Sequence, residues 1–431
     1  MAELKTVAFH TLGCKLNFSE TSSLSRILEN EGFEKKEFDD RADIYVINTC
    51  SVTENADKEC RYLVRSIQRK SPESLVVITG CYAQLKPKEI AEIPGVNLVL
   101  GAAEKFNIAQ HIRQLARGDS AKICSCDIEE VSGFHSSYSL NDRTRAFLKV
   151  QDGCDYNCSF CTIPAARGKS RSDSIEHIIS NVKELAANGA KEVVLTGINL
   201  GDFRPPAPQR RNFEEIPAAE KQNFYSLINE LDKIDGIQRY RISSIEPNLL
   251  TNEIIEFVAN SDKFMPHFHV PLQSGSNAIL GMMRRRYRKE LYADRVKLIK
   301  TLMPHCAIGA DVIVGFPGET ENHFKETFDF LHSLDISYLH VFTYSERDNT
   351  HALTLRPVVP KSVRHERNAT LRNLSYMKMQ YFTEQHAGQT RKVLFERQAR
   401  GTMMEGYTDN YIRVTVPFRQ ELVNNIVDWK I

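Results

Sequence analysis

The sequence predicts an α/β protein in three parts: an N-terminal parallel sheet of flavodoxin-like type, a partial (β/α)6 TIM-like barrel, and a small C-terminal antiparallel β-barrel. The first two parts are predicted by two series of strand-like apolar runs that alternate with helical segments. The third is predicted by a long helical stretch followed by short alternating segments around Gly and Asn turns. The length of 431 residues also calls for two or three domains.

The first part spans residues 1–118. Its predicted strands are "TVAF", "ADIYVINT", "SLVVITG" and "VNLVLG", and its predicted helices are "SETSSLSRILENEG", "ENADKECRYLVRSIQRK", "KPKEIAEI" and "NIAQHIRQLARG". We expect Asn17 or Ser19 to cap the first of these helices. Residues 119–143 are rich in Ser, Gly and Asn and have no period, so they predict a linker.

The second part spans residues 144–360. Its predicted strands are "AFLKVQ", "EVVLTGIN", "RYRISSIE", "HFHVPLQ", "AIGADVIVGF" and "YLHVFTY", with helical segments between most of them. Six such units predict a partial or full parallel barrel, and the Pro-rich segment 203–224 predicts an inserted loop. In the third part, 361–431, we expect a basic helix to near Gln385 and then the small β module.

Composition points to a soluble globular protein, with 42% hydrophobic and 26% charged residues. No apolar run reaches 18 residues and the N-terminus lacks the pattern of a secretory signal, so we expect a cytoplasmic location without a membrane partner. In a reducing compartment the ten cysteines favour metal binding or catalysis over disulfides. Net charge is only +1, but residues 284–300 hold eight basic and two acidic residues, which fits either a polyanion-binding surface or a solvated helix face.

Three cysteines, Cys14, Cys50 and Cys81, each follow a strand-like run and a small polar turn. Because parallel strands end at one edge of a sheet, these thiols should converge there and form a soft metal site. Buried structural cysteines and a zinc site are the alternatives. Three widely spaced thiolates favour an iron–sulfur cluster with one iron left open.

Three further cysteines, Cys154, Cys158 and Cys161, have the spacing C-x-x-x-C-x-x-C. This loop resembles the cluster-binding loop of radical S-adenosylmethionine enzymes, where three thiolates hold a [4Fe–4S] cluster and the cofactor chelates the fourth iron; a zinc or structural role is the alternative. Other strand ends resemble the cofactor-binding segments of that superfamily. The resemblance implies cofactor contacts from Phe160, Thr196, Gly197, Ser244, Glu246, Gln273, Val312 and Arg347.

The whole chain is similar to the methylthiotransferase family, which joins a three-cysteine domain, a radical S-adenosylmethionine barrel and an RNA-binding TRAM module. The motifs "INTCSVTENAD", "VVITGCYAQ", "CTIPAARGKSRS", "HVPLQSGS" and "IVGFPGET" carry the resemblance. "TLGCKLN" with "SET" resembles the branch that acts on N6-threonylcarbamoyladenosine at tRNA position 37. The other branches act on isopentenyladenosine or on an aspartate of a ribosomal protein. A non-catalytic iron–sulfur RNA-binding protein is a rival of another class.

The resemblance implies that the first three cysteines hold an auxiliary [4Fe–4S] cluster whose sulfur is methylated by one cofactor molecule. The second cluster then reduces another cofactor molecule, and the resulting radical removes hydrogen from C2 of the adenine before CH₃S transfer. Radical chemistry is needed because no side-chain base can remove an unactivated aromatic hydrogen.

The resemblance also implies that the anticodon loop of tRNA presents adenosine 37, that an electron donor such as flavodoxin or ferredoxin and a sulfur donor take part, and that DNA does not. We expect basic residues to hold the tRNA phosphates, namely Arg284, Arg285, Arg286, Arg391 and Lys392.

Two departures from the family pattern are visible. The family usually has Tyr-Ser-x-Arg-x-Gly-Thr on the last barrel strand, whereas this chain has "YSERDNT" with Asn349 in place of glycine. Asn tolerates a positive φ, so we expect the turn to be kept. Four cysteines match no family ligand: Cys60, Cys124, Cys126 and Cys306.

Overall fold

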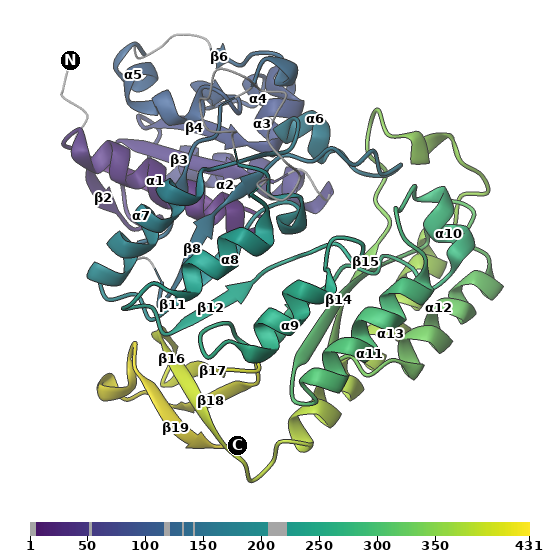
Figure 1. Cartoon of the computed structure of the whole chain (residues 1–431). Coiled ribbons are helices and arrows are strands. Elements are labelled where there is room, and N and C mark those ends of the chain that lie inside the picture. The colour runs from purple at the N-terminus through teal and green to yellow at the C-terminus, as the bar shows by residue number, and fades with distance from the viewer. Residues whose placement is uncertain (1–5, 51–53, 116–120, 132, 141–142, 206–221) are drawn as a thin grey trace, which may run out of the picture. The chain divides into compact units, whose positions relative to one another are not determined.

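The computed structural model describes residues 6–50, 54–115, 121–131, 133–140, 143–205 and 222–431 (Figure 1). These residues form two compact units. The first contains the described residues of Met1–Ser139, Phe147–Tyr156 and Cys161–Arg171, and the second those of Leu140–Ala146, Asn157–Phe160 and Ser172–Ile431. Most of the predicted insertion at 203–224 lies outside the described residues.

The first unit is built on a six-stranded parallel sheet of order β2-β1-β3-β4-β5-β6, which confirms the flavodoxin-like prediction. The strands are β1 (Thr6–Thr11), β2 (Glu34–Lys36), β3 (Ile44–Thr49), β4 (Leu75–Gly80), β5 (Leu98–Leu100) and β6 (Lys122–Cys124). Strands β3 and β4 are buried along their whole length because apolar clusters cover both faces of the sheet. The helices are α1 (Lys15–Asn30), α2 (Glu54–Lys70), α3 (Cys81–Leu85), α4 (Pro87–Ala91) and α5 (Ile108–Arg113).

Two details of the first unit differ from the sequence prediction. Helix α1 begins at Lys15 after Cys14, and no side chain caps it. Asn17 lies inside the helix, where its Nδ2 donates to the carbonyls of Leu12 and Thr49, so it ties the helix to the sheet edge instead. The predicted linker also contributes β6 to the sheet and the short β7 (Ser137–Tyr138), since a strand of two or three residues leaves no visible period.

The second unit holds a series of parallel strands separated by helices, as expected for a partial barrel. Strand β11 (Glu192–Thr196) pairs with β12 (Arg239–Ile242), and β13 (His267–His269) pairs with β14 (Ala307–Val314), which pairs with β15 (Tyr338–Thr343). Parallel bridges such as Ser244 to His269 join β12 to β13. The helices are α7 (Ile175–Ala187), α8 (Phe224–Asp232), α9 (Asn252–Asn260), α10 (Asn277–Met282), α11 (Lys289–Leu302) and α12 (Glu321–Ser333).

Short elements surround the second cysteine set. They are β8 (Arg145–Lys149), β9 (Gln151–Asp152), α6 (Ile163–Arg167) and β10 (Arg171–Ser172). Strand β8 starts in the second unit and ends in the first.

The C-terminal part of the second unit consists of helix α13 (Lys361–Glu384) and an antiparallel sheet of order β18-β17-β16-β19. Its strands are β16 (Thr390–Arg400), β17 (Met403–Thr408), β18 (Arg413–Pro417) and β19 (Ile426–Lys430), and they enclose a small apolar core around Phe395 and Met404. The predicted helix and β module are confirmed. Among the helices of the described ranges, none is both long and apolar enough to cross a membrane.

Candidate active site

The first three cysteines follow neighbouring parallel strands of one sheet. Cys14 follows β1, Cys50 directly follows β3, and Cys81 begins α3 directly after β4. A Cβ at Gly13 would lie 2.6 Å from Cβ and 2.9 Å from Sγ of Cys50, so the residue before Cys14 is packed against the second cysteine. Burial raises the pKa of Cys81, and the charge of Cys14 raises it further while Arg167 lowers it. The three thiols therefore lie at one edge of the sheet, as predicted from the strand pattern.

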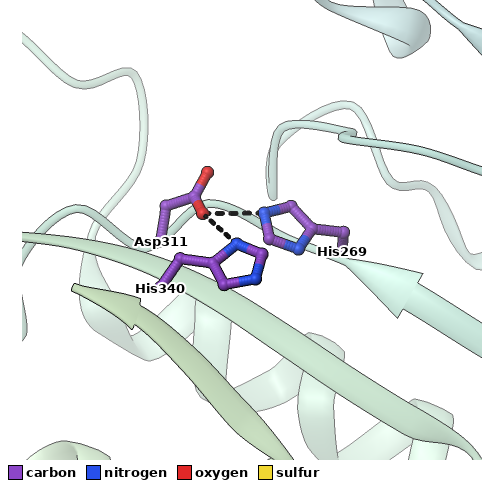
Figure 2. A group of neighbouring side chains, drawn as sticks. All are labelled: His269, Asp311 and His340. Atoms are coloured by element: carbon purple, nitrogen blue, oxygen red, sulfur yellow. Dashed lines mark hydrogen bonds and ion pairs between the residues drawn. The ribbon is translucent and has the colours of Figure 1, made fainter. Parts of the chain in front are cut away.

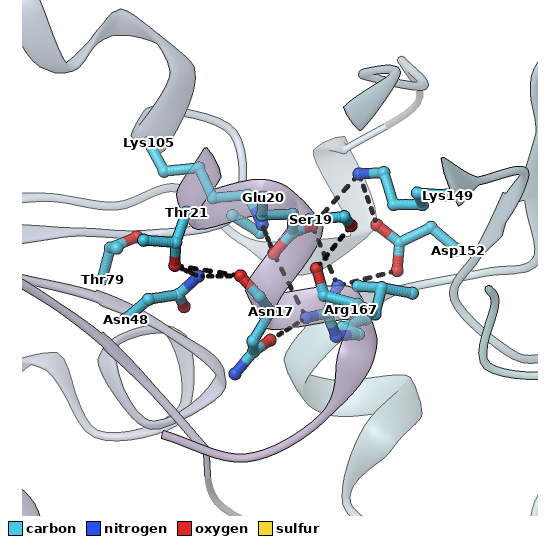
Figure 3. Close-up of polar contacts among 12 residues, drawn as sticks. Asn17, Ser19, Glu20, Thr21, Asn48, Thr79, Lys105, Lys149, Asp152 and Arg167 are labelled. Carbon is cyan, nitrogen blue, oxygen red and sulfur yellow. Dashed lines mark hydrogen bonds and ion pairs between the residues drawn. The ribbon is translucent and has the colours of Figure 1, made fainter. Parts of the chain in front are cut away.

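The first unit contains a buried charge network (Figure 3). Its residues Arg167, Glu20 and Lys105 act electrostatically on Cys81. Glu20 of α1 is fully buried, and its carboxylate lies 2.7 Å from Nζ of Lys105, 3.1 Å from Nζ of Lys149 and 3.2 Å from Nη1 of Arg167. Asp152 Oδ1 accepts from Arg167 Nη1 at 3.0 Å. Burial alone would raise the pKa of Glu20, but Arg167, Lys105 and Lys149 hold it well below its usual value. The carboxylate therefore stays ionised.

Positive charge exceeds negative charge in this network. Four cations (Lys105, Lys149, Arg167 and Arg171) meet two carboxylates (Glu20 and Asp152), and Arg167 Nε is buried with no hydrogen-bond partner among the described residues. The same cations line a small cavity of about 10 Å³ that Cys81 also lines. A buried excess of cations calls for a nearby anion, and thiolates that ligate an iron–sulfur cluster are anionic. The site thus fits the predicted auxiliary cluster.

The second three cysteines, Cys154, Cys158 and Cys161, lie in the segment between β9 and α6. Each sulfur accepts a hydrogen bond: Cys154 from the backbone N of Tyr156 at 3.4 Å, Cys161 from that of Ile163 at 3.5 Å, and Cys158 from a guanidinium at 3.1 Å. Hydrogen bonds to sulfur are a usual feature of iron–sulfur ligation. This donor set fits the cluster that the spacing predicts.

The guanidinium that donates to Cys158 belongs to Arg285, which also forms an ion pair with Glu246. Burial raises the pKa of Glu246, and the positive charge of Arg285 lowers it. The sequence predicts an RNA contact for Arg285, but its side chain is only 4% exposed and is paired with Glu246. Arg285 therefore joins Cys158 to Glu246, two residues of the predicted cluster and cofactor sites. Its neighbours Arg284 and Arg286 are exposed.

The other predicted cofactor residues lie near the carboxyl ends of the barrel strands. Thr196 ends β11, and its Oγ1 is buried without a hydrogen-bond partner in the described part of the chain, as expected of a group awaiting a ligand. Gly197 follows it, Ser244 bridges to His269, and Gln273, with a strained φ of 67°, bridges to Val312. Phe160 packs edge-on against Phe316, and Arg347 follows β15.

Of the predicted RNA contacts at the C-terminal module, Lys392 is exposed, whereas Arg391 is held by Asp409 at 2.6 Å. The unassigned cysteines Cys60 and Cys306 are buried, which raises the pKa of each thiol to about 12. Cys124 and Cys126 are half-buried. Unreactive packing roles suit the first two.

Sequence reasoning missed the buried charge network. Lys149 and Asp152 stand in and after the apolar run "AFLKVQ", and both are nearly inaccessible to solvent. A charged residue within a buried strand was the available signal, because such a charge needs a partner. The partners themselves come from segments over a hundred residues away and could not be found from the sequence pattern.

Known protein families match segments in both units. Residues 6–101 match the family described as Uncharacterized protein family UPF0004, and residues 148–331 match the Radical SAM superfamily. The chain is 40% identical to a threonylcarbamoyladenosine tRNA methylthiotransferase, MtaB, of Bacillus subtilis (strain 168), over 99% of this chain and 94% of the relative. It is 39% identical to the protein of the same name from Aquifex aeolicus (strain VF5), over 94% and 95%.

More distant similarities follow the same pattern. A tRNA-2-methylthio-N(6)-dimethylallyladenosine synthase of Clostridium tetani (strain Massachusetts / E88) is 30% identical over 99% of this chain and 93% of the relative. Among solved structures, the radical S-adenosylmethionine methyltransferase TsrM of Kitasatospora setae aligns with a TM-score of 0.55 and 16% identity, over 78% of this chain and 73% of TsrM. At that identity the likeness supports the fold alone.

Proposed function

The chain belongs to the radical S-adenosylmethionine family of tRNA methylthiotransferases, and we propose that it places a methylthio group on C2 of N6-threonylcarbamoyladenosine at position 37 of tRNA. It is thus a sulfur-group transferase. The choice of substrate rests on the 40% and 39% identity to relatives named for this nucleoside, against 30% and 32% to relatives named for dimethylallyladenosine.

Members of this family use S-adenosylmethionine and an iron–sulfur cluster. We assign the cluster to Cys154, Cys158 and Cys161. When bound, these groups supply the radical chemistry that opens the unactivated C–H bond of the adenine. Arg285 would orient the ligand set, because it contacts both Cys158 and Glu246. Thr196 would offer its unpaired hydroxyl to the cofactor.

A second [4Fe–4S] cluster, held by Cys14, Cys50 and Cys81, is part of the proposal. Their convergence at one sheet edge and the excess of cations beside Cys81 support it. In this assignment Lys105 and Arg167 balance the negative charge of the thiolates. The chain would then divide the work, with this site presenting sulfur and the barrel site generating the radical.

We further propose that tRNA phosphates meet exposed basic residues, with Arg284, Arg286 and Lys392 as the first candidates. The functional division would be an auxiliary-cluster domain over 1–118, a barrel over 144–360, and a helix with a TRAM module over 361–431. The partners would be a sulfur donor and an electron donor such as flavodoxin or ferredoxin, in the cytoplasm.

The proposal is tested by mass spectrometry of nucleosides in tRNA from cells that lack the gene. We expect 2-methylthio-N6-threonylcarbamoyladenosine to disappear and its precursor to accumulate, with restoration by the gene on a plasmid. Loss of the dimethylallyl product instead would assign the chain to the other tRNA branch. If anaerobic protein with dithionite forms no 5′-deoxyadenosine, the enzyme assignment itself fails.

A further inference from the structure

The second unit contains a compact His–Asp–His group that none of the assignments above uses (Figure 2). His269 ends β13, Asp311 lies in β14, and His340 lies in β15. One carboxylate oxygen, Oδ1 of Asp311, lies 2.9 Å from Nε2 of His269 and 3.3 Å from Nδ1 of His340. The centroids of the two imidazole rings are 5.1 Å apart.

The three side chains share one face of the sheet. Asp311 stands directly opposite His340, and His269 stands opposite Gly309, two residues before Asp311. Their sequence neighbours on the other face, such as Phe268 and Val312, are fully buried. The group therefore lies on the more open face of these strands.

Two of the proposed cofactor residues, Ser244 and Glu246, interact with this group. Ser244 bridges to His269. The charge of Asp311 also raises the pKa of Glu246. A substrate bound at the His–Asp–His group would therefore lie beside Ser244 and Glu246, two of the proposed cofactor residues.

The exposed fraction of the side chain increases from His269 through Asp311 to His340. The side chains of His269, Asp311 and His340 are 9%, 22% and 55% exposed. Because Nδ1 of His340 faces Asp311, Nε2 is the ring atom left to meet a ligand. His340 thus presents its Nε2 at the accessible end of an otherwise enclosed set.

The carboxylate at the centre stays ionised. Burial alone would raise the pKa of Asp311, but the hydrogen bonds from His269 and His340 hold it well below its usual value. An ionised carboxylate only accepts, so each ring directs an N–H toward it. That contact fixes the orientation of His340, and when its ring carries a second proton, Nε2–H becomes a charge-assisted donor.

The proposed substrate has a group that matches this donor. A threonylcarbamoyl substituent carries a carboxylate, whereas a dimethylallyl substituent is a pure hydrocarbon. A carboxylate that leaves water needs a cationic or strongly donating partner. A site built around such a partner also discriminates against an analogue that leaves it unpaired.

We propose that His340, held in place by Asp311 and His269, binds the threonyl carboxylate of the substrate nucleoside and thereby selects it over nucleosides with an apolar substituent. This inference rests on the proposed function and names the residue that sets its specificity. Two histidines and a carboxylate could also bind a transition metal. The geometry favours the first role, because both rings already engage a single oxygen of Asp311.

The test uses cluster-loaded full-length protein and three anticodon stem-loop RNAs that differ only at adenosine 37. One carries threonylcarbamoyl, one carries its carboxamide, which has the same shape without the charge, and one carries dimethylallyl. Equilibrium binding is measured by fluorescence anisotropy for the wild type, for His340→Gln and for the control His332→Gln, an exposed histidine at the end of α12.

We expect the wild type and the control to bind the carboxylate RNA about 10- to 100-fold more tightly than the carboxamide RNA. In His340→Gln that ratio should fall to about one, with binding of the dimethylallyl RNA unchanged. Asp311→Asn, which keeps the side-chain shape, should lower the ratio as well. Equal weakening of all three RNAs, or an unchanged ratio, would overturn the inference.

Two further measurements, of bound metal and of methylthiolation activity, distinguish failure of this inference from failure of the proposed function. A non-iron transition metal that is bound in one equivalent by the wild type and lost in His340→Gln would replace the inference with a metal site. If the wild type methylthiolates only the dimethylallyl RNA, the proposed function fails. If it methylthiolates the threonylcarbamoyl RNA while His340→Gln keeps the full carboxylate preference, only the inference fails.

Discussion

At the scale of single residues, Glu20 decides how the auxiliary site is held together. It has no exposure to water and contacts three cations, Lys105, Lys149 and Arg167. These cations come from distant parts of the chain, so one carboxylate joins α1 to the segments around residues 105, 149 and 167. Breaking a buried ion pair by removing one partner is costly, since the opposite charge remains buried.

We predict that Glu20→Gln lowers the free energy of unfolding of the cluster-free protein by about 3–5 kcal/mol. Differential scanning calorimetry should show this as a lower melting temperature for the first unit. The matched control is Glu37→Gln, an exposed residue in the same unit, which should melt like the wild type. Equal melting temperatures for the two variants would show that the network does not stabilise the fold.

The same network predicts a dependence of stability on pH. Although burial alone would raise it, the pKa of Asp152 is held well below its usual value by Arg167 and Lys149, and the pKa of Glu20 is lowered in the same way. In the unfolded chain such groups titrate near pH 4. The unfolded state therefore binds more protons in acid, so this stability is complete above about pH 5 and is lost as the pH falls toward the folded pKa values.

We expect the melting temperature of the wild type to fall more steeply between pH 6 and pH 4 than that of Asp152→Asn, which has one fewer carboxylate to protonate. Calorimetry across that range measures both slopes. Parallel curves would mean that Asp152 is not the source of the acid sensitivity.

At the scale of elements, the turn between β4 and α3 places Cys81. Gly80 has a φ of +97°, and a Cβ there would lie 2.3 Å from the carbonyl oxygen of Thr49. Backbone cannot yield as a flexible side chain can, so only glycine allows β3 and β4 to end this close together. The approach brings the cysteines that follow the two strands to the same edge.

We predict that Gly80→Ala destabilises the cluster-free protein by about 2 kcal/mol or more relative to Gly189→Ala. Gly189 also has a positive φ, 82°, but nothing lies within 4 Å of its added Cβ, so the pair isolates the steric clash from the backbone strain. Iron content after reconstitution should also be lower in Gly80→Ala alone. Indistinguishable unfolding curves would contradict this account of the turn.

The sequence pattern predicts some of these elements correctly and others incorrectly, and the difference has physical reasons. Long apolar runs such as that of β3 predict strands and their parallel order well, because burial on both faces leaves a continuous signal. Asn349 has a φ of 63°, so the turn that the family forms with glycine is kept here, as its residue type predicts. The start of α1 is mispredicted, since Asn17 makes tertiary hydrogen bonds that compete with capping.

At the scale of the whole molecule, two cysteine sets serve two proposed tasks. Their spacing is visible in the sequence, and their place after parallel strands follows from the fold class. The surroundings of these cysteines cannot be predicted from the sequence pattern. A basic run predicts positive charge but not the direction in which each side chain points. Arg285 points inward, whereas Arg284, which has a φ of 58°, and Arg286 stay exposed. Only the folded chain shows that His269, Asp311 and His340 meet.

The central claim is that one chain generates a radical at one cysteine set and delivers sulfur from the other. The most direct measurement incubates anaerobically reconstituted protein with S-adenosylmethionine, dithionite and threonylcarbamoyl stem-loop RNA, and quantifies 5′-deoxyadenosine and methylthiolated nucleoside by mass spectrometry. The wild type should form both products, and the variant with Cys14, Cys50 and Cys81 changed to Ala should form only 5′-deoxyadenosine. Methylthiolated nucleoside from that variant, or loss of 5′-deoxyadenosine with fold and first cluster intact, would contradict the account.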